Sequence, residues 1–173
     1  MIKAVLVDLD NTLITNPDHQ FAQSFLSLFR QHFSQALAIE NVDKLFREAI
    51  QDWGIAGYHT ETNQVRLAKI IANSGDVTVE LALDELNRFY TNAVPSLGIH
   101  TSPIEGASEA LQALFNEDIA LVIATNPFYP RAAIEQRMMR GNIPTDGPYS
   151  LITGSDTMHY SKQNPAYYAE IIA

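Results

Sequence analysis

The 173-residue sequence contains no cysteine, which excludes disulfide bonds, thiolate nucleophiles and thiolate metal sites together. Basic residues are also scarce, because eleven Lys and Arg stand against twenty Asp and Glu and give a formal net charge of -9. A chain this acidic is not expected to bind nucleic acid or an anionic membrane. Any anionic substrate must therefore be held by a few locally placed basic groups.

Long hydrophobic runs are missing too. No apolar segment reaches the roughly 18 residues that a membrane span needs. The N-terminus begins with a strand-like run and not with a basic region followed by an apolar signal core. A glycine-rich G-x-G-x-x-G turn does not follow that first run, since it continues as Asp10-Asn11-Thr12, so a dinucleotide site is not expected there. We expect a cytoplasmic protein with no membrane partner.

Three short apolar runs predict β-strands. The first, "IKAVLVDL" (residues 2–9), is rich in Val, Ile and Leu, as is typical of a strand buried on both faces of a parallel sheet. Residues 119–124 repeat the pattern, and residues 149–153 form a weaker third run. Helices are predicted over residues 106–117 and 131–140. This alternation predicts an α/β fold with a doubly wound parallel sheet.

The stretch from residue 16 to residue 94 differs from the rest. Aromatic and aliphatic residues recur there at helical spacing, for example from Phe21 to Phe33, and predict four helices with no strand among them. We interpret these aromatics as the core of a separate helical lobe. The segment "VPSLGIHTSP" (residues 94–103) is the expected hinge through which the chain returns to the sheet.

Polar side chains follow each predicted strand at its carboxyl end. Asp8 and Asp10 end the first strand, Thr125 and Asn126 end the second, and Lys162 follows the third. Ligands of doubly wound sheets bind outside the carboxyl ends of the strands, so we expect these side chains to line one crevice. Residues i and i+2 of a strand point the same way, and two close carboxylates repel unless a cation intervenes. Mg²⁺, which prefers oxygen ligands, is the cation that we expect between them.

This set of groups suits phosphoryl transfer. One carboxylate can attack phosphorus and form an aspartyl-phosphate, the second can transfer a proton, and the metal and the lysine can neutralise charge. The Thr hydroxyl and strand-end amides can hold the phosphoryl oxygens. Taken singly, the D-x-D-x-T motif indicates a solvated turn, Thr125–Asn126 a helix cap and Lys162 a surface lysine. Their placement after three successive strands favours a shared site.

Three segments, "DLDNTL", "IATN" and "SKQNPAYYAEI", resemble in order and spacing the first three motifs of the haloacid dehalogenase-like hydrolase superfamily. The resemblance implies a Rossmann-like core, residues 1–15 and 95–173, with an inserted all-helical cap, residues 16–94. It also implies a phosphatase-type enzyme, a phosphoric monoester hydrolase. The dehalogenases of the superfamily lack the second carboxylate, which is Asp10 here, so halide displacement is disfavoured.

The resemblance also implies a role for each residue. Asp8 is the expected nucleophile, and Asp10 the general acid/base that protonates the leaving group and later activates water. Thr125, helped by Asn126, is expected to bind the phosphoryl group, and Lys162 to stabilise the nucleophile and the intermediate. Mg²⁺ is expected to be held by the Asp8 carboxylate and the Asp10 backbone carbonyl.

The sequence departs from the pattern of the superfamily in two places. Gln163 stands where a proline commonly follows the motif lysine, and we expect a small effect. The fourth motif, a strand ending in metal-binding aspartates, has no counterpart; Asp156 precedes the lysine and is expected in a loop or helix cap. We therefore expect a core that is incomplete at its C-terminal end. Either the sequence is a truncated portion of a longer hydrolase, in which case Mg²⁺ binding should be weak, or a partner chain covers the edge of the sheet. The first strand would then be an exposed apolar edge that favours self-association.

The expected substrate is a small phosphorylated metabolite, because a helical cap excludes water and bulky polymers. Tyr58, His59 and Arg66 of the cap are candidates for contact with it. The alternative function is a catalytically silent binding or interaction module that retains the fold, or a truncated inactive fragment. The intact acidic pair, Thr125 and Lys162 favour the enzyme, whereas the missing metal-binding aspartates favour the silent module.

Overall fold

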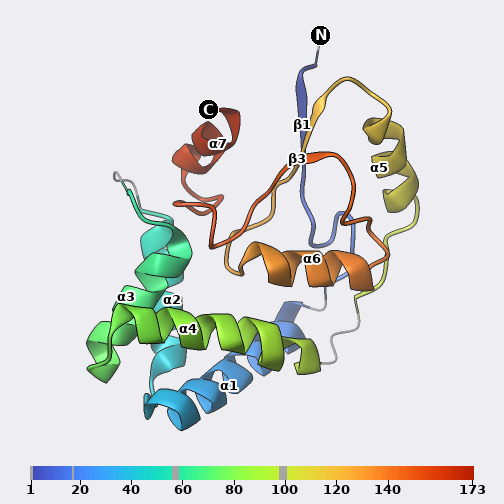
Figure 1. Ribbon diagram of the computed structural model, residues 1–173. Coiled ribbons are helices and arrows are strands. Elements are labelled where there is room, and N and C mark those ends of the chain that lie inside the picture. Colours follow the sequence, from blue (N-terminus) through green and yellow to red (C-terminus); the bar gives the residue numbers. More distant parts are fainter. Residues whose placement is uncertain (1, 17, 56–58, 98–100) are drawn as a thin grey trace.

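The computed structural model describes residues 2–16, 18–55, 59–97 and 101–173. One strand comes first, four α-helices follow, and strands and helices then alternate (Figure 1). The elements in chain order are β1 (Ala4–Val7), α1 (Asp18–Leu37), α2 (Val42–Trp53), α3 (Asn63–Gly75), α4 (Val79–Arg88), the π-helix η1 (Phe89–Ala93), the 3-10 helix η2 (Val94–Leu97), α5 (Ala107–Phe115), β2 (Ala120–Ile123), α6 (Arg131–Arg140), β3 (Tyr149–Ile152) and α7 (Pro165–Ile172).

The three predicted strands form one parallel sheet in the order β1-β2-β3. Val7, the last residue of β1, pairs with Ile123 of β2, and Ile123 pairs with Ile152 of β3. The carboxyl ends of all three strands therefore meet at one edge of the sheet. This register confirms that the residues following the strands share one end of the fold.

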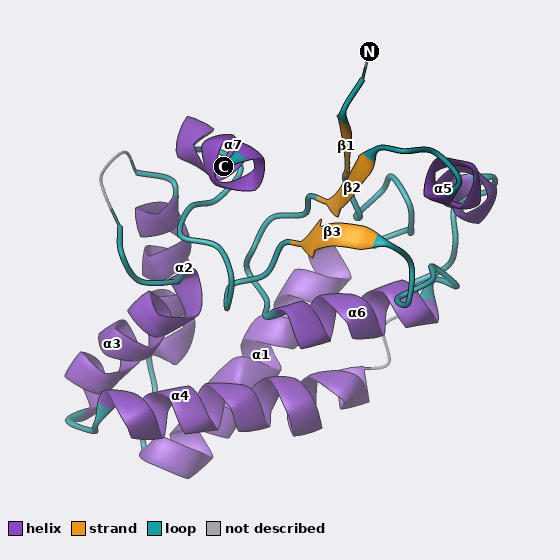
Figure 2. Ribbon diagram, turned by 45° about the horizontal axis from the view of Figure 1, so that its top comes forward, coloured by secondary structure: helices purple, strands orange, loops and turns teal. Residues whose placement is uncertain are grey.

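Helices cover both faces of the sheet, as a doubly wound fold requires (Figure 2). Leu111 of α5 and Ile134 and Met138 of α6 pack with the strands in one buried cluster. Tyr167 of α7 belongs to a second cluster, which Leu151 of β3 joins from the opposite face. The predicted α/β class and the predicted helices over residues 106–117 and 131–140 are confirmed, with ends shifted by one or two residues where they differ.

The apolar run alone indicated a first strand buried on both faces, which is wrong, whereas the expectation that this strand is an exposed apolar edge is confirmed among the described residues. Ala4 and Leu6 are exposed, and Val5 and Val7 are only partly buried. The reason is position in the sheet, because β1 pairs with β2 alone among the described residues. β2, which has a neighbour on each side, is the strand whose last three residues are all buried.

The helices α1 to α4, with η1 and η2, surround a large hydrophobic cluster, which Ala133 of α6 joins. Phe25, Phe29 and Phe33 are at most 1% exposed, which confirms their interpretation as helix-packing core; the side chain of Phe21 lies outside the described residues. The hydroxyls of Thr62 and Thr78 accept hydrogen bonds from the backbone N–H groups of Val65 and Leu81, and so cap α3 and α4.

The chain leaves the sheet and returns to it by two paired connections. The N–H of Thr15 donates to the carbonyl of Ser102 at 2.8 Å, and the N–H of Ile104 donates to the carbonyl of Leu13 at 3.0 Å. The predicted hinge, residues 94–103, thus begins in η2 and ends beside the outgoing chain, while its residues 98–100 lie outside the described residues. In the described parts of the chain, no helix has the length and apolarity to cross a membrane.

Candidate active site

A tight turn directly after β1 directs the two aspartates away from the core. The carbonyl of Leu9 accepts hydrogen bonds from the N–H groups of Leu13 and Ile14, at 2.9 and 3.1 Å. Leu9, Leu13 and Ile14 are at most 3% exposed and anchor the turn in the cluster beneath the sheet. The side chains of Asp8 and Asp10 are 42% and 27% exposed. The acidic pair therefore lies on the open side of the turn.

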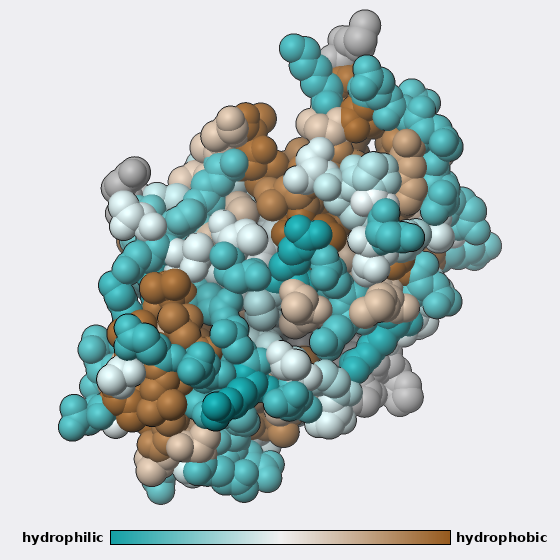
Figure 3. Space-filling view, in the orientation of Figure 1, coloured by the Kyte–Doolittle hydropathy of each residue, from teal (hydrophilic) through white to brown (hydrophobic). Residues whose placement is uncertain are grey.

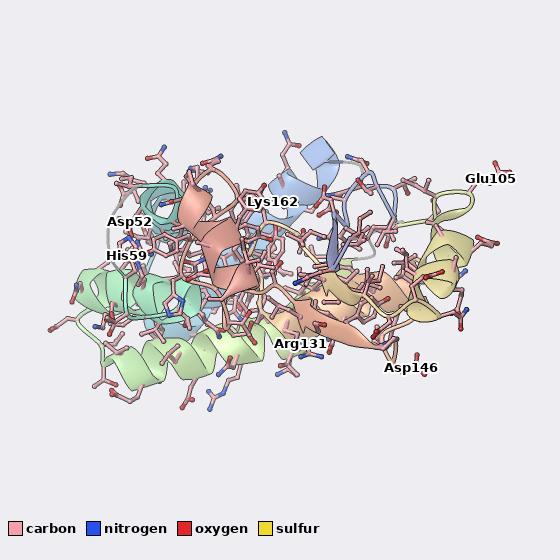
Figure 4. The ribbon with its side chains drawn as sticks, turned by 90° about the horizontal axis from the view of Figure 1, so that it is seen from above. Asp52, His59, Glu105, Arg131, Asp146 and Lys162 are labelled. Carbon is pink, nitrogen blue, oxygen red and sulfur yellow. The ribbon has the colours of Figure 1, made fainter. Side chains whose placement is uncertain are left out.

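Lys162 meets Asp8 across the end of the sheet. Its Nζ donates to Oδ1 of Asp8 at 2.7 Å, and the lysine side chain is 22% exposed. The backbone N–H of Lys162 donates to Oδ1 of Asn126 at 3.1 Å. Three of the predicted site residues, from three separate segments, are thus joined by direct contacts. Figure 4 places Lys162 between the sheet and the part of the helical lobe that carries Asp52 of α2 and His59 of the connection to α3.

Asp10 pairs with a residue that the sequence pattern did not single out. Arg137 of α6 donates from Nη1 to Oδ2 of Asp10 at 3.1 Å and from Nη2 to Oδ1. The Arg137 side chain is only 7% exposed. A guanidinium matches a carboxylate in this two-bond geometry, which gives a stronger and more directional pair than a lysine would. Each of the two aspartates therefore has its own cation, and their mutual repulsion is offset by Lys162 and Arg137.

The Asp10–Arg137 pair lies beside a tyrosine. Burial raises the pKa of Tyr129; Arg137 opposes that rise and Asp10 adds to it. Tyr129 therefore remains a neutral phenol at physiological pH. Its ring packs against Phe25 of α1, with centroids 5.0 Å apart, so it joins the site to the helical cluster.

Thr125 is held from behind by two buried hydroxyl groups. Its N–H donates to Oγ1 of Thr153 at 3.0 Å, and its carbonyl accepts from the hydroxyls of Thr153 and Tyr167, both at 2.9 Å. Thr153 and Tyr167 are fully buried, and Thr125 is 3% exposed. In the part of the chain that the structure describes, the hydrogen bonds of Thr125 engage its backbone. The network fixes the backbone of Thr125 at the end of β2.

The segment that carries Lys162 (residues 153–164, the Lys162 segment) is fastened to the helices. The N–H groups of Asn63 and Gln64, at the start of α3, donate to the carbonyls of Met158 and Ser155 at 2.8 and 2.7 Å. The N–H of Ser161 donates to the carbonyl of Trp53 at 3.0 Å. The position of Lys162 therefore depends on α2 and α3 as well as on β3.

Arg66 strengthens the same junction. Its Nη1 donates to the carbonyl of His159 at 2.9 Å, and its Nη2 pairs with Asp52 of α2. These contacts bury the Arg66 guanidinium in the junction, and contact between Arg66 and a substrate stays a prediction. Tyr58 lies outside the described residues. The N–H of His59 donates to the hydroxyl of Tyr160 at 3.2 Å, also within the junction.

Asp156 has the structural role that its position suggests. Its Oδ1 accepts a hydrogen bond of 2.8 Å from the N–H of Arg131, the first residue of α6. The prediction of a loop or helix-cap position for Asp156 is confirmed. A carboxylate there stabilises the helix that presents Arg137.

The fit of a metal ion can be judged from the available oxygen atoms. Within the described ranges, no three His, Asp or Glu side chains lie close enough to hold a metal ion. Mg²⁺, however, usually keeps several waters and binds through one or two carboxylates plus substrate phosphates. The Asp8 carboxylate and the Asp10 backbone carbonyl fit such a shared site, whereas a site enclosed by protein ligands does not fit.

Three residues of the site were missed by sequence reasoning. Thr153 carried a usable signal, since it ends the third strand as Thr125 ends the second. Arg137 carried a weaker one, because it is a charged residue on the helix face of Ile134 and Met138. Tyr167 gave no such signal, since an aromatic residue in a helix most often indicates core packing.

A comparison with protein-family models identifies the family of the chain. The model described as "Hydrolase: haloacid dehalogenase-like hydrolase" matches residues 2–173. The chain belongs to this family. The haloacid dehalogenase-like fold predicted from the three motifs is therefore shown for nearly the whole chain. No curated protein matches the chain.

Solved structures with a similar arrangement include proteins of this superfamily. One is a predicted phosphoglycolate phosphatase from Haemophilus somnus, with 14% identity, coverage of 98% of this chain and 70% of the other, and a TM-score of 0.48. A second is a HAD family enzyme from Bacteroides thetaiotaomicron, with 14% identity, coverage of 98% and 76%, and a TM-score of 0.48. A third is an L-2-haloacid dehalogenase, with 18% identity, coverage of 97% and 70%, and a TM-score of 0.42. All three TM-scores are below 0.5, so the family model decides the assignment.

Proposed function

We propose that this haloacid dehalogenase-like hydrolase is a Mg²⁺-dependent phosphatase that hydrolyses small phosphorylated metabolites through an aspartyl-phosphate on Asp8. The observation that carries the proposal is the 2.7 Å contact between Lys162 Nζ and the partly exposed Asp8 carboxylate, at the end of β1 where a ligand can reach it. A lysine in this position orients the nucleophile and neutralises charge that gathers on the transferred group.

In the first step, the Asp8 oxygen that is not bonded to Lys162 attacks phosphorus. The bond between phosphorus and the ester oxygen breaks, and Asp10 donates a proton to the departing oxygen. In the second step, Asp10 takes a proton from water, whose oxygen attacks phosphorus. Phosphate leaves and the Asp8 carboxylate is restored. Arg137 holds the Asp10 carboxylate in one orientation through two hydrogen bonds.

We propose that the residues after the carboxyl end of β2, together with the neighbouring turn after β1, bind the phosphoryl oxygens. Asn126 is positioned through its bond to the N–H of Lys162, and Thr125 through the buried hydroxyls of Thr153 and Tyr167. Haloacid dehalogenase-like hydrolases generally use Mg²⁺, and here the Asp8 carboxylate and the Asp10 carbonyl would hold it. When bound, the ion supplies positive charge for the phosphoryl oxygens.

A panel of small phosphate esters, assayed for phosphate release with and without Mg²⁺, tests the proposal. We expect turnover of at least one ester by the wild-type chain and a loss of at least about a thousandfold in Asp8→Asn. Asp146→Asn is the matched control, because Asp146 is exposed and Figure 4 places it well apart from Lys162. If Asp8→Asn hydrolyses the ester as fast as the control Asp146→Asn, Asp8 is not the nucleophile.

The alternative function is a silent binding module with the same fold. The observation in its favour is that, among the described residues, no three acidic or histidine side chains gather around a metal ion. Such a module would bind phosphate esters without releasing phosphate. The same panel separates the two functions, since the module predicts no hydrolysis of any ester.

A further inference from the structure

Four charged side chains in two ion pairs surround the proposed phosphoryl site. Asp8 pairs with Lys162, and Asp10 pairs with Arg137. Their formal charges, two negative and two positive, sum to zero. The rest of the chain is strongly acidic, with a net charge of -9. This cluster of four side chains is therefore neutral within an acidic protein, and without Arg137 of α6 its net charge would be negative.

We propose that Arg137 is a site residue whose charge makes the site neutral, so that Mg²⁺ and a phosphate dianion bind together as a neutral pair and each binds poorly alone. The inference rests on the proposed function.

The geometry shows that Arg137 is built into the site. Its side chain is 7% exposed and lies on the same helix face as Ile134 and Met138, which are fully buried. A guanidinium in such surroundings needs a partner, because an unpaired buried charge is very costly. The two-bond contact with Asp10 satisfies this need and holds Arg137 at a fixed position.

Linked binding follows from the charge of the two ligands. Mg²⁺ alone brings two positive charges next to Lys162 and Arg137, and a phosphate dianion alone brings two negative charges next to Asp8 and Asp10. In a partly buried site these repulsions are only partly screened. When both ligands bind, the added charges cancel. By thermodynamic reciprocity, each ligand must raise the affinity of the other by the same factor.

Isothermal titration tests this linkage without requiring turnover. Mg²⁺ is titrated into the chain at pH 8 with and without inorganic phosphate, and phosphate with and without Mg²⁺, after correction for the association of the two ions in solution. We expect each ion to lower the dissociation constant of the other by the same factor, at least about tenfold. Independent binding of the two ions would overturn the inference.

Variants that change the site charge by one unit should move the two affinities in opposite directions. Arg137→Met makes the site negative, so we expect Mg²⁺ alone to bind more tightly and phosphate more weakly, each by about tenfold. Asp10→Asn makes the site positive and should do the reverse. Arg137→Lys keeps the charge and should leave both affinities near those of the wild type.

The matched control is Arg131→Met, which removes the same charge from the same helix. Arg131 lies in the first turn of α6, its side chain is 50% exposed, and Figure 4 places it apart from Lys162. We expect it to change neither affinity. If Arg137→Met folds, a shift of both affinities in the same direction, or no change at all, would overturn the inference. If Arg137→Met does not fold, the other two variants decide. Asp10→Asn must then bind phosphate more tightly and Mg²⁺ more weakly, and Arg137→Lys must bind both as the wild type does.

The outcomes also separate this inference from the proposed function. Linked binding of Mg²⁺ and phosphate by a chain that hydrolyses no ester would contradict the proposed function and leave the inference standing. Ester hydrolysis by a chain that binds the two ions independently would contradict the inference and leave the proposed function standing.

Discussion

Asp43, in the first turn of α2, is a carboxylate whose ionisation supports the folded state. A hydrogen bond from Arg30 is the main cause that lowers its pKa from 3.8 to about 2; burial opposes this and Arg47 adds to it. The contacts measure 2.6 Å from Arg30 Nη2 and 2.8 Å from Arg47 Nη2, both to Oδ2 of Asp43. The Asp43 side chain is 8% exposed, and both arginines are more than half exposed.

The lowered pKa of Asp43 predicts acid-dependent stability. Because the pKa is lower in the folded state, the stabilisation is fully present above about pH 4 and is lost as the pH falls from about 4 to about 2. We expect Asp43→Asn to reduce the free energy of unfolding by about 1 kcal/mol at pH 7, since the arginines are solvent-screened. Urea titrations between pH 7 and pH 2 measure this. Equal pH dependence of the wild type and Asp43→Asn would contradict the prediction.

Tyr167 is the residue that supports Thr125 from α7. Burial raises its pKa, so its hydroxyl stays a donor to the carbonyl of Thr125. We expect Tyr167→Phe to cost about 1 kcal/mol of unfolding free energy, the usual value for one lost hydrogen bond, and to lower turnover by displacing Thr125. Tyr168→Phe, at a neighbouring position that is 43% exposed, is the control. Equal stability of the two variants would show that the Tyr167 bond contributes nothing.

At the residue scale, sequence reasoning found the groups that follow the strands and missed those that approach from helices. Asp8, Asn126 and Lys162 could be placed together because strand ends of a parallel sheet meet at one edge. Arg137 could not, since it lies 127 positions from Asp10 and its approach depends on how α6 packs against the sheet. The partner of Asp10 is set by tertiary packing, which no local pattern reports.

Helices α2 and α3 fix the Lys162 segment, and this is the main finding at the scale of elements. N-terminal amide groups of a helix lack partners within the helix. In α3, those of Asn63 and Gln64 donate to carbonyls of the Lys162 segment. Arg66 adds a side-chain bond to His159 and a pair with Asp52. We infer that movement of these helices would either carry Lys162 along or break the junction.

Arg66→Met tests this junction. We expect the amide of Ser161 to lose hydrogen-exchange protection, by at least about tenfold, because its acceptor, the carbonyl of Trp53 in α2, then moves relative to the segment. Lys69→Met is the matched control, since Lys69 lies on the same helix and pairs with Glu61 at the surface. If Arg66→Met changes only the amides within α3, the helices and the Lys162 segment are not coupled.

The elements themselves were largely predictable, but their burial was less so. All three strands and both helices flanking β2 follow from apolar runs and helical spacing, and the boundaries differ by a few residues at most. The error concerned β1, whose apolar composition indicated burial on both faces. Composition reports what a strand could bury; the position of the strand in the sheet and the helices packed on its faces decide what it does bury.

At the scale of the whole molecule, β1 presents an apolar edge. Leu6 is 39% exposed and Ile2 is 71% exposed, and Figure 3 shows hydrophobic atoms at the surface just below the N-terminus. An unpaired strand edge is a template for pairing with another chain. We propose that copies of the chain associate through β1. The net charge of -9 opposes this association, so salt should strengthen it.

Leu6→Lys tests the association by placing a charge on the edge. Sedimentation equilibrium should show that the wild type self-associates more strongly as salt increases and that Leu6→Lys associates at least about tenfold more weakly. Leu81→Lys is the matched control, because Leu81 of α4 is 40% exposed. A wild-type chain that remains monomeric at all concentrations, or equal effects of the two variants, would exclude β1 as the interface.

The central claim is that Asp8 receives the phosphoryl group. Acid quenching during turnover of an ester with Mg²⁺, followed by peptide mass spectrometry, measures this directly. We expect a phosphoryl adduct on Asp8 in the peptide that contains residues 4–16, formed in the wild type and lost in Asp8→Asn. Turnover with no adduct on Asp8, or with an adduct on Asp10 in its place, would show that Asp8 is not the nucleophile.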